Sequence, residues 1–206
     1  MAEQLPIFEL PLALLPGEQV PLHIFEERYM RMVGESIESG RPFGILLRDD
    51  VGARAVGCTA EVTGVLQRFE DGRMDIVVTG VAPFRVLDRF DDPEDPAAEI
   101  ELIDEPEPFA TGEQADAARR AFRELAERAS GQRPAAEELA GSSAYDLAAR
   151  VELPAEAKQE LLQTRDEDRR MELLAGELNG LRRALDRIEE TAELARSNGK
   201  VRVRRA

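Results

Sequence analysis

Residues 5–29 read LPIFELPLALLPGEQVPLHIFEERY and carry a proline at every fifth position from Pro6 to Pro21. A polyproline II ligand repeats every three residues, so prolines at this spacing would not share one edge of such a ligand. Large apolar side chains alternate at period two between residues 8 and 14, which predicts a strand with one buried face. Pro16-Gly17 suits a type II turn with Gly17 at positive φ. The stretch therefore predicts a strand, a turn and a short second strand, followed by a helix.

The strand pattern continues through residues 43–104. FGILL at 43–47 is a short apolar run, as expected of a strand buried on both faces. Alternating segments follow at 57–69, 73–80 and 84–90, and Asp71-Gly72 between the first two predicts a type I′ hairpin. One helix is expected inside this region, over about 23–39, with Gly40 as its stop signal. Several short strands with one tight hairpin predict a small barrel or a strongly bent sheet.

From about residue 110 the apolar period changes to that of helices. The last predicted helix, of about seven turns, has apolar residues at alternating spacings of three and four, which is a heptad seam. This seam comprises Met171, Leu174, Leu178, Leu181, Leu185, Ile188, Ala192 and Ala195. We favour packing of this helix on its own bundle over an intermolecular coiled coil. The sequence thus predicts an α+β chain, with a β-barrel lobe at 1–110 and a helical lobe at 111–206.

Composition and net charge argue against several classes of function. The 206 residues carry a net charge of −15, and residues 1–104 hold 21 acidic residues against nine arginines, a net charge of −12. Such a surface repels nucleic acid and anionic membranes. The chain has no long apolar run and no signal-like start, and its single cysteine forms no internal disulfide, so we expect a cytoplasmic protein. One histidine and one cysteine argue against a zinc site, and no cofactor is expected.

His23 and Cys58 are the only residues of their types, so a nucleophilic Cys–His pair has to be considered. Cys58 is predicted to face inward on a strand, where cysteine usually behaves as a small apolar residue. His23 lies near the predicted helix start and is expected to hydrogen-bond the backbone. Glu26 and Glu27 fall in the first turn of that helix, where the helix dipole favours negative charge. We therefore interpret all four residues as structural and predict no catalytic residue.

Three blocks of the sequence together resemble one protein family. The opening block, residues 5–33, resembles the start of the N-terminal substrate-binding domain of Lon-type ATP-dependent proteases. GCTAEVTGVLQRFEDGRMDIVVTGVAPFRVLD, at 57–88, resembles the next block of that domain, and LPAEAKQELLQTRDEDRRMELLAGEL, at 153–178, resembles its helical portion. The resemblance covers roughly residues 5–195. It implies a PUA-like β-barrel followed by a helical lobe with a long C-terminal helix.

The motor and peptidase of Lon proteases leave no recognisable signature in this sequence. A P-loop requires the pattern GxxxxGK[ST], but the only two lysines, Lys158 and Lys200, lie in other contexts. Neither lysine belongs to a Ser–Lys peptidase pattern. We therefore expect a stand-alone, non-catalytic recognition module rather than an ATP-dependent protease.

The resemblance implies that the ligand is unfolded or exposed apolar polypeptide, and that a protease or chaperone system is a possible partner. Candidate contacts are Leu14 and Leu15 beside the Pro-Gly turn, Met30 on the first helix, and Phe90. Two alternatives stay open, an RNA-binding PUA-like protein and an uncharacterised hydrolase. The acidic barrel half disfavours the first, and the scarcity of His, Cys and Lys disfavours the second. A monomer, or a weak dimer through the C-terminal helix, is the expected state.

Overall fold

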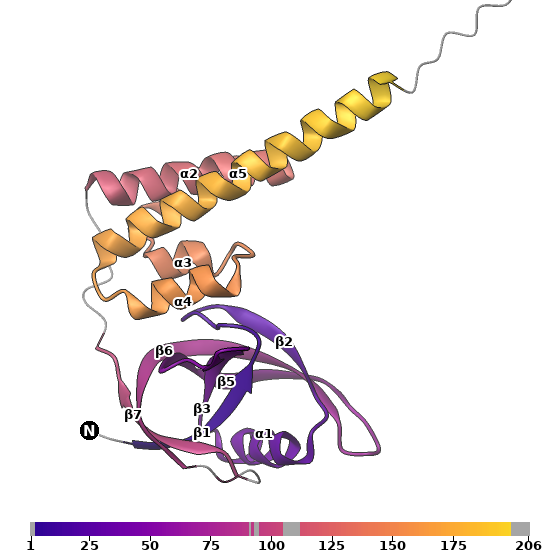
Figure 1. The fold of residues 1–206 in the computed structure, drawn as a ribbon, viewed down its shortest axis with the longest axis vertical. Coiled ribbons are helices and arrows are strands. Elements are labelled where there is room, and N and C mark those ends of the chain that lie inside the picture. Colours follow the sequence, from indigo (N-terminus) through magenta and orange to yellow (C-terminus); the bar gives the residue numbers. More distant parts are fainter. Residues whose placement is uncertain (1–2, 91, 93–94, 105–111, 199–206) are drawn as a thin grey trace, which may run out of the picture.

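A ring of five strands forms the first part of the protein (Figure 1). The computed structural model describes residues 3–90, 92, 95–104 and 112–198. Its strands are β1 (Glu3–Leu10), β2 (Gln19–Ile24), β3 (Phe43–Asp49), β4 (Gly52–Ala53), β5 (Val56–Arg68), β6 (Met74–Phe90) and β7 (Ala97–Leu102). Neighbouring strands pair in the order β1-β7-β6-β5-β3, and β3 pairs back to β1. The pairing is therefore circular, as in the small barrel that the sequence predicts.

Four of the five contacts in the ring are antiparallel, and the fifth, between β1 and β3, is parallel. The parallel pair aligns Ile7 with Gly44 and Leu10 with Leu47. Its crossover contains β2 and helix α1 (Glu27–Ser39). A parallel pair needs such a long connection, whereas antiparallel neighbours can be joined by a hairpin. The alternating pattern of the sequence did not indicate this pairing.

The inside of the ring is too narrow for side chains at every position. Phe84 of β6 belongs to a small buried cluster with residues of β1, β3 and β7. A Cβ added at Gly44 of β3 would lie 2.7 Å from the Phe84 ring, and one added at Gly57 of β5 would lie 3.0 Å from it. The two glycines therefore give Phe84 the space it occupies between β3 and β5.

The Pro16-Gly17 turn is of the predicted type. The amide of Glu18 donates to the carbonyl of Leu15 at 3.1 Å, which closes the turn, and Gly17 has φ of 77°. The turn is then attached to β6, because Gly17 donates to the carbonyl of Gly80 and the amide of Gly80 donates to that of Glu18, both at 2.9 Å. The opening stretch of the sequence therefore returns to the sheet instead of extending into solvent.

Two local predictions in the strand region are wrong. The β5–β6 hairpin is not of type I′, since that turn needs two residues with positive φ, and no non-glycine residue among those described has one. Its loop holds three residues, with Phe69 bonded to Arg73 and Gly72 at φ of 90°. The embedded helix begins at Glu27 rather than near residue 23, because β2 pairs with β6 as far as Ile24. Its predicted end is confirmed, since Gly40 caps α1 in the left-handed region.

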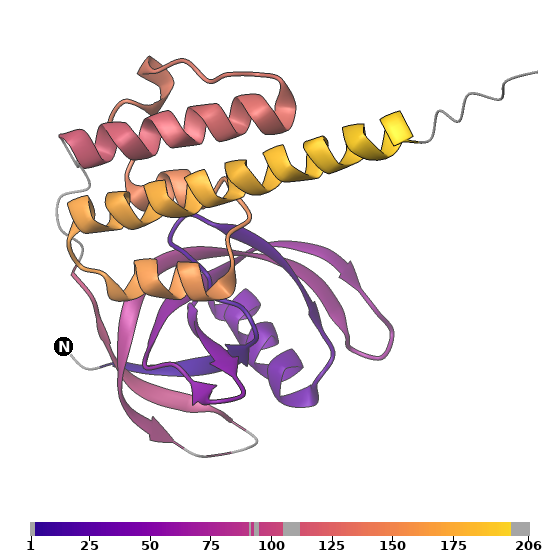
Figure 2. The same cartoon turned by 45° about the horizontal axis from the view of Figure 1, so that its top comes forward.

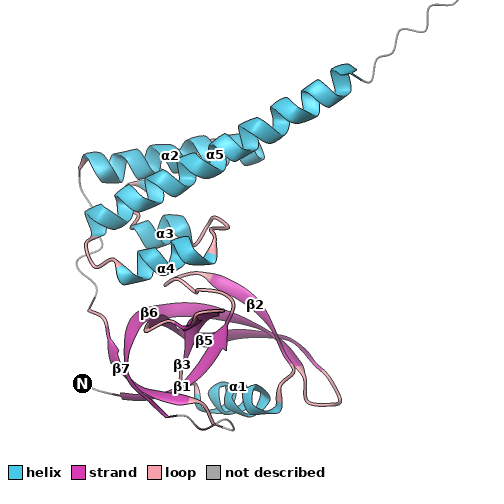
Figure 3. Cartoon of the chain, in the orientation of Figure 1, coloured by secondary structure: helices cyan, strands magenta, loops and turns pink. Residues whose placement is uncertain are grey.

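A layer of helices covers one end of the ring, and α1 lies at the other end (Figure 3). These helices are α2 (Glu113–Ser130), the 3₁₀ turn η1 (Glu137–Leu139), α3 (Ala144–Ala148), α4 (Ala155–Gln163) and α5 (Glu167–Asn198). Helices α3 and α4 lie between the ring and the pair formed by α2 and α5, and α5 extends well past the end of α2 (Figure 2). The predicted lobe boundary near residue 110 falls in 105–111, outside the described residues.

Strands and helices share one hydrophobic core. A single buried cluster includes Phe8 of β1, Ile76 of β6, Phe122 of α2 and Leu174 of α5. Polar contacts add to this core along α4, whose Gln159 amide donates to the Val56 carbonyl at 3.0 Å. Burial of apolar surface at this junction, at about 25 cal/mol per Å², favours one fixed arrangement of strands and helices.

Candidate functional site

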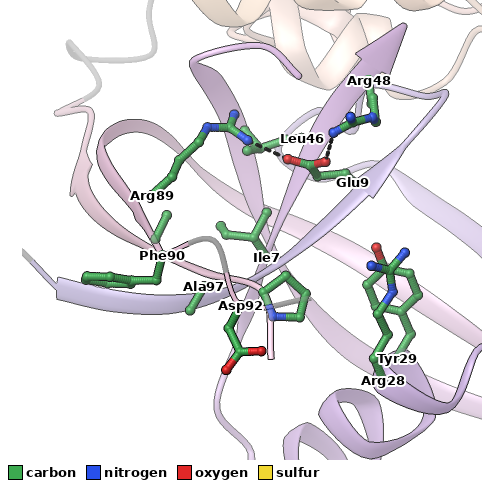
Figure 4. Close-up of a pocket in the computed structure, with 12 residues that line it drawn as sticks. Ile7, Glu9, Arg28, Tyr29, Leu46, Arg48, Arg89, Phe90, Asp92 and Ala97 are labelled. Carbon is green, nitrogen blue, oxygen red and sulfur yellow. Dashed lines mark hydrogen bonds and ion pairs between the residues drawn. The ribbon is translucent and has the colours of Figure 1, made fainter. Parts of the chain in front are cut away.

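A cavity of about 460 Å³ opens beside the ring, between β1, β3 and the strands β6 and β7 (Figure 4). Its apolar lining comprises Ile7, Leu46, Phe90, Pro96, Ala97 and Ala98. Ile7 and Leu46 are buried in the small cluster inside the ring, whereas Phe90 is 43% exposed at the cavity. The cavity therefore combines rigid apolar walls with one large apolar side chain that solvent or a ligand can reach.

The polar side of the cavity is organised around Glu9 of β1. The guanidinium groups of Arg48, on β3, and Arg89, on β6, both bond the Glu9 carboxylate from opposite sides (Figure 4). Arg89 also donates to the backbone carbonyl of Arg54 at 3.1 Å, which holds its side chain in place. The carboxylate is thus held between two guanidinium groups and acts as a positioned ion-pair partner.

Arg28 and Tyr29, both on α1, form another wall of the cavity. The Arg28 guanidinium lies 4.5 Å from the centre of the Tyr29 ring and bonds Glu26 at 2.9 Å. Burial raises the pKa of the Tyr29 hydroxyl, so that this group stays neutral at ordinary pH. The described residues of the lining include no serine, cysteine, lysine or histidine that could act as a nucleophile or a proton shuttle. Chemically the cavity suits binding of an apolar group flanked by polar atoms.

Of the four predicted contact residues, only Phe90 lies in this cavity. Leu14 and Leu15 are completely buried, so their prediction as contacts on the surface is wrong. The physical reason is the turn beside them, which is bonded to Gly80 and holds both leucines against the main core. Leucine next to a Pro-Gly turn has the same sequence pattern whether the turn faces solvent or the interior.

Met30 lies away from the cavity. It is half-buried on α1, and a Cβ added at Gly72 in the β5–β6 hairpin would lie 3.5 Å from its sulfur. The structure therefore does not bring Met30 and Phe90 into one site. Met30 as a polypeptide contact stays a prediction.

His23 and Cys58 do not form a pair. The Cys58 side chain is fully buried on β5, and its sulfur bonds the Thr59 carbonyl at 3.4 Å. His23 is half exposed on β2, where its Nδ1 lies 2.6 Å from the Asp75 carboxylate on β6. The bonding partner of His23 is thus a side chain rather than the predicted backbone group, while Cys58 faces inward as predicted.

Sequence reasoning missed the ion-pair cluster around Glu9. Glu9 is separated from Arg48 by 39 residues and from Arg89 by 80 residues, and single charged residues on strands usually indicate a solvated face. Phe25 lies before α1 rather than within it and is 62% exposed. It follows β2 and stacks near His23, with 6.0 Å between ring centres.

In the described part of the chain, no three His, Cys, Asp or Glu residues are placed so that they could hold a metal ion. Of the helices that the structure describes, none has the length and apolar character to span a membrane.

Comparison with known proteins places the chain in a family. The family model of the ATP-dependent protease La (LON) substrate-binding domain matches residues 4–180. A solved Lon N-terminal domain protein from Xanthomonas campestris has a TM-score of 0.67 and 24% identity, covering 84% of this chain and 98% of that one. The N-terminal domain of the Mycobacterium avium complex Lon protease has a TM-score of 0.63 and 20% identity, covering 86% and 98%. These two likenesses show the shared fold. Because the family model matches most of the sequence, the chain belongs to the Lon substrate-binding domain family.

Proposed function

We propose that the protein binds unfolded or exposed apolar polypeptide, without ATP and without cleaving it. The observation that carries this proposal is membership of a substrate-binding domain family over residues 4–180. The cavity beside the ring supports it, because its described lining offers apolar walls and charged groups but no serine, cysteine, lysine or histidine. We place this activity in the cytoplasm, since one buried cysteine is compatible with a reducing compartment.

Phe90 is the proposed anchor for an apolar client side chain. It is 43% exposed, and it lines the cavity together with Ile7 and Ala97. A client side chain that covers it would remove apolar surface from water on both partners, at about 25 cal/mol per Å². Affinity should still be only micromolar or weaker, because a flexible client loses conformational entropy when it docks.

A substitution at Phe90 tests the site. We expect Phe90→Ala to weaken binding of a labelled, reduced and unfolded protein by about three- to tenfold, as the loss of one partly buried aromatic contact implies. Leu87→Ala is the matched control, because Leu87 is 51% exposed on the same strand but does not line the cavity. Fluorescence anisotropy gives both affinities. Equal affinities for the two variants would show that Phe90 does not belong to the binding site.

The ligand class is tested separately with a labelled RNA of similar size at two salt concentrations. Apolar binding should depend little on salt, whereas affinity for nucleic acid falls steeply as salt rises. The net charge of −12 over residues 1–104 predicts no measurable RNA binding. Tight, salt-sensitive RNA binding without a response to unfolded protein would overturn the proposed function. A gel of the same samples shows whether any client is cleaved, and cleavage would contradict the non-catalytic role.

A further inference from the structure

Among the described residues, the outer edge of β5 has no strand partner over most of its length. β3 pairs with β5 only at Cys58, Thr59 and Ala60. From Glu61 to Arg68 the described pairing partners of β5 all belong to β6, on the other side of the strand. An unpaired strand edge presents a row of backbone N–H and C=O groups, and the natural partner for such a row is another extended backbone.

A groove of about 340 Å³ follows this edge. Five consecutive residues of β5, from Glu61 to Val65, line one side of it. Because successive side chains of a strand point to opposite faces, a run of consecutive lining residues places the groove along the edge rather than on one face. The opposite wall is the C-terminal end of α1, with Ser36, Ile37 and Gly40. A groove between an edge strand and a helix has the shape of an extended peptide.

The middle of this edge is open to a second backbone. Gly64 has no side chain, and a Cβ built there would meet only Val77 of the neighbouring strand, at 3.8 Å. Glycine within a strand often marks a close approach of another backbone. The β5–β6 register shifts between Val62 and Gly64 and again between Val65 and Gln67. Such bulges twist the edge, so pairing along 61–68 is expected in short stretches rather than as one continuous ladder.

Charge indicates which segments fit the groove. Glu61 lies on the strand side, and Glu35 and Glu38 are exposed on α1 next to the helical wall, against two arginines, Arg41 in the groove and Arg68 at the end of β5. The surrounding strand region is strongly acidic as well, with a net charge of −12 over residues 1–104. The local charge therefore favours neutral or basic segments and repels acidic ones.

We infer that an extended, neutral or basic segment of client polypeptide pairs through its backbone with β5 between Glu61 and Arg68, in the groove against α1. This inference rests on the proposed function and adds the mode and the place of binding. Backbone pairing at a strand edge gives affinity without demanding one sequence, because every polypeptide carries the same donors and acceptors. Recognition of this kind suits a protein whose clients share an unfolded state rather than a motif.

Matched peptides test the backbone contribution. The probe is acetyl-Lys-Val-Thr-Val-Arg-Val-Thr-Lys-amide, with two derivatives N-methylated at alternate residues so that one or the other edge of the extended peptide is blocked. We expect the unmodified peptide to slow hydrogen exchange of amides within 61–68. One N-methylated derivative should bind about tenfold more weakly and the other almost normally. Recognition by side chains alone would treat the two derivatives alike, and that result would overturn the inference.

Protein variants give an independent readout. Ile37→Arg places a cation in the groove and should weaken binding of the basic peptide about tenfold, while Val51→Arg, at a side chain 91% exposed elsewhere, should leave it unchanged. Gly64→Pro should abolish protection at the edge, and its melting curve shows whether the fold is retained. If Gly64→Pro unfolds the protein, the N-methylated peptides and the Ile37→Arg variant still test whether the peptide binds at this edge.

The remaining outcomes separate this inference from the proposed function. Peptide binding that protects only residues around the Phe90 cavity overturns the edge-pairing mode, while polypeptide recognition stands. If protection of the 61–68 amides from hydrogen exchange increases with protein concentration in the absence of peptide, the edge pairs with a second copy of the chain. That result would also overturn the inference. Failure to bind both the peptide and the unfolded protein overturns the proposed function together with this inference.

Discussion

At the residue scale, Gly17 shows how one backbone conformation directs the opening of the fold. Its φ of 77° lies in the left-handed region, which residues with a Cβ adopt at a cost. A Cβ added there would meet nothing within 4 Å, so the cost of a substitution comes from the backbone alone. A substitution at Gly17 therefore measures the cost of backbone strain without a contribution from steric crowding.

We expect Gly17→Val to lower the free energy of unfolding by about 1–3 kcal/mol, the usual range for one residue forced into a disfavoured φ/ψ region. Gly17→Asn is the control, because asparagine tolerates left-handed φ and should lose less than about 1 kcal/mol. Urea titrations of the parent and both variants give the values. A valine variant as stable as the parent would mean that this turn relaxes at no cost.

At the scale of one element, α5 shows where the periodic pattern of the sequence and the observed packing differ. The heptad seam begins as predicted, with Met171, Leu174 and Leu178 completely buried. It then reaches Ile188, which is 64% exposed although the flanking Asp186 and Glu189 still pair with Arg128 near the end of α2. The side chain of Ala195 lies outside the described residues. The helix has 32 residues, about nine turns at 3.6 residues per turn, rather than the seven predicted. A weak dimer through this helix stays a prediction.

Side chains at the two ends of the seam should contribute differently to the free energy of unfolding. Leu178→Ala removes a fully buried side chain and should cost about 2–5 kcal/mol, through lost burial and the cavity left behind. Ile188→Ala should change stability by less than about 0.5 kcal/mol, since the side chain is mostly in water and alanine is the better helix former. Thermal and urea unfolding of the two variants measure the contrast. A large loss at Ile188 at low protein concentration would show an intramolecular contact that the fold does not display.

At the scale of the whole molecule, α4 joins the helical layer to the ring through charged and polar side chains. Lys158 pairs with Glu18, and both side chains are almost buried. Glu18 also accepts a hydrogen bond from the Leu15 amide at 3.0 Å, so the pair connects α4 to the Pro-Gly turn. Two residues earlier on α4, Glu156 bonds Arg54 at 2.9 Å, just before the strand β5. The junction therefore combines one nearly buried ion pair, Lys158–Glu18, with one that is open to solvent, Glu156–Arg54.

Breaking the buried pair should weaken the whole protein. Lys158→Met leaves the Glu18 carboxylate buried without its cation, and we expect a loss of about 3 kcal/mol. Arg169→Met is the matched control, since Arg169 pairs with Glu172 on the exposed surface of α5 and should contribute less than about 1 kcal/mol. Equal losses in urea unfolding would show that the buried pair is compensated by water or by a local rearrangement.

The sequence by itself determined the local conformations and the family. Gly17 and Gly40 adopt positive φ as predicted, because turn and cap conformations depend mainly on neighbouring residues. The apolar run at 43–47 likewise identified its strand, which is buried on both faces. The change from period two to period 3.6 separated the strands from the later helices for the same reason. The resemblance to the Lon N-terminal domain, which rested on blocks of adjacent residues, is confirmed by the family match over 4–180.

Only the tertiary structure decided which surfaces are available. It closed the ring through the parallel pair of β1 and β3, buried Leu14 and Leu15, and left Phe90 exposed at a cavity. It also gathered Glu9 with two arginines that are 39 and 80 residues away. Burial and ion pairing depend on segments far apart in the chain, which only the three-dimensional fold brings together. A periodic pattern specifies which face of an element is apolar, but not what covers it.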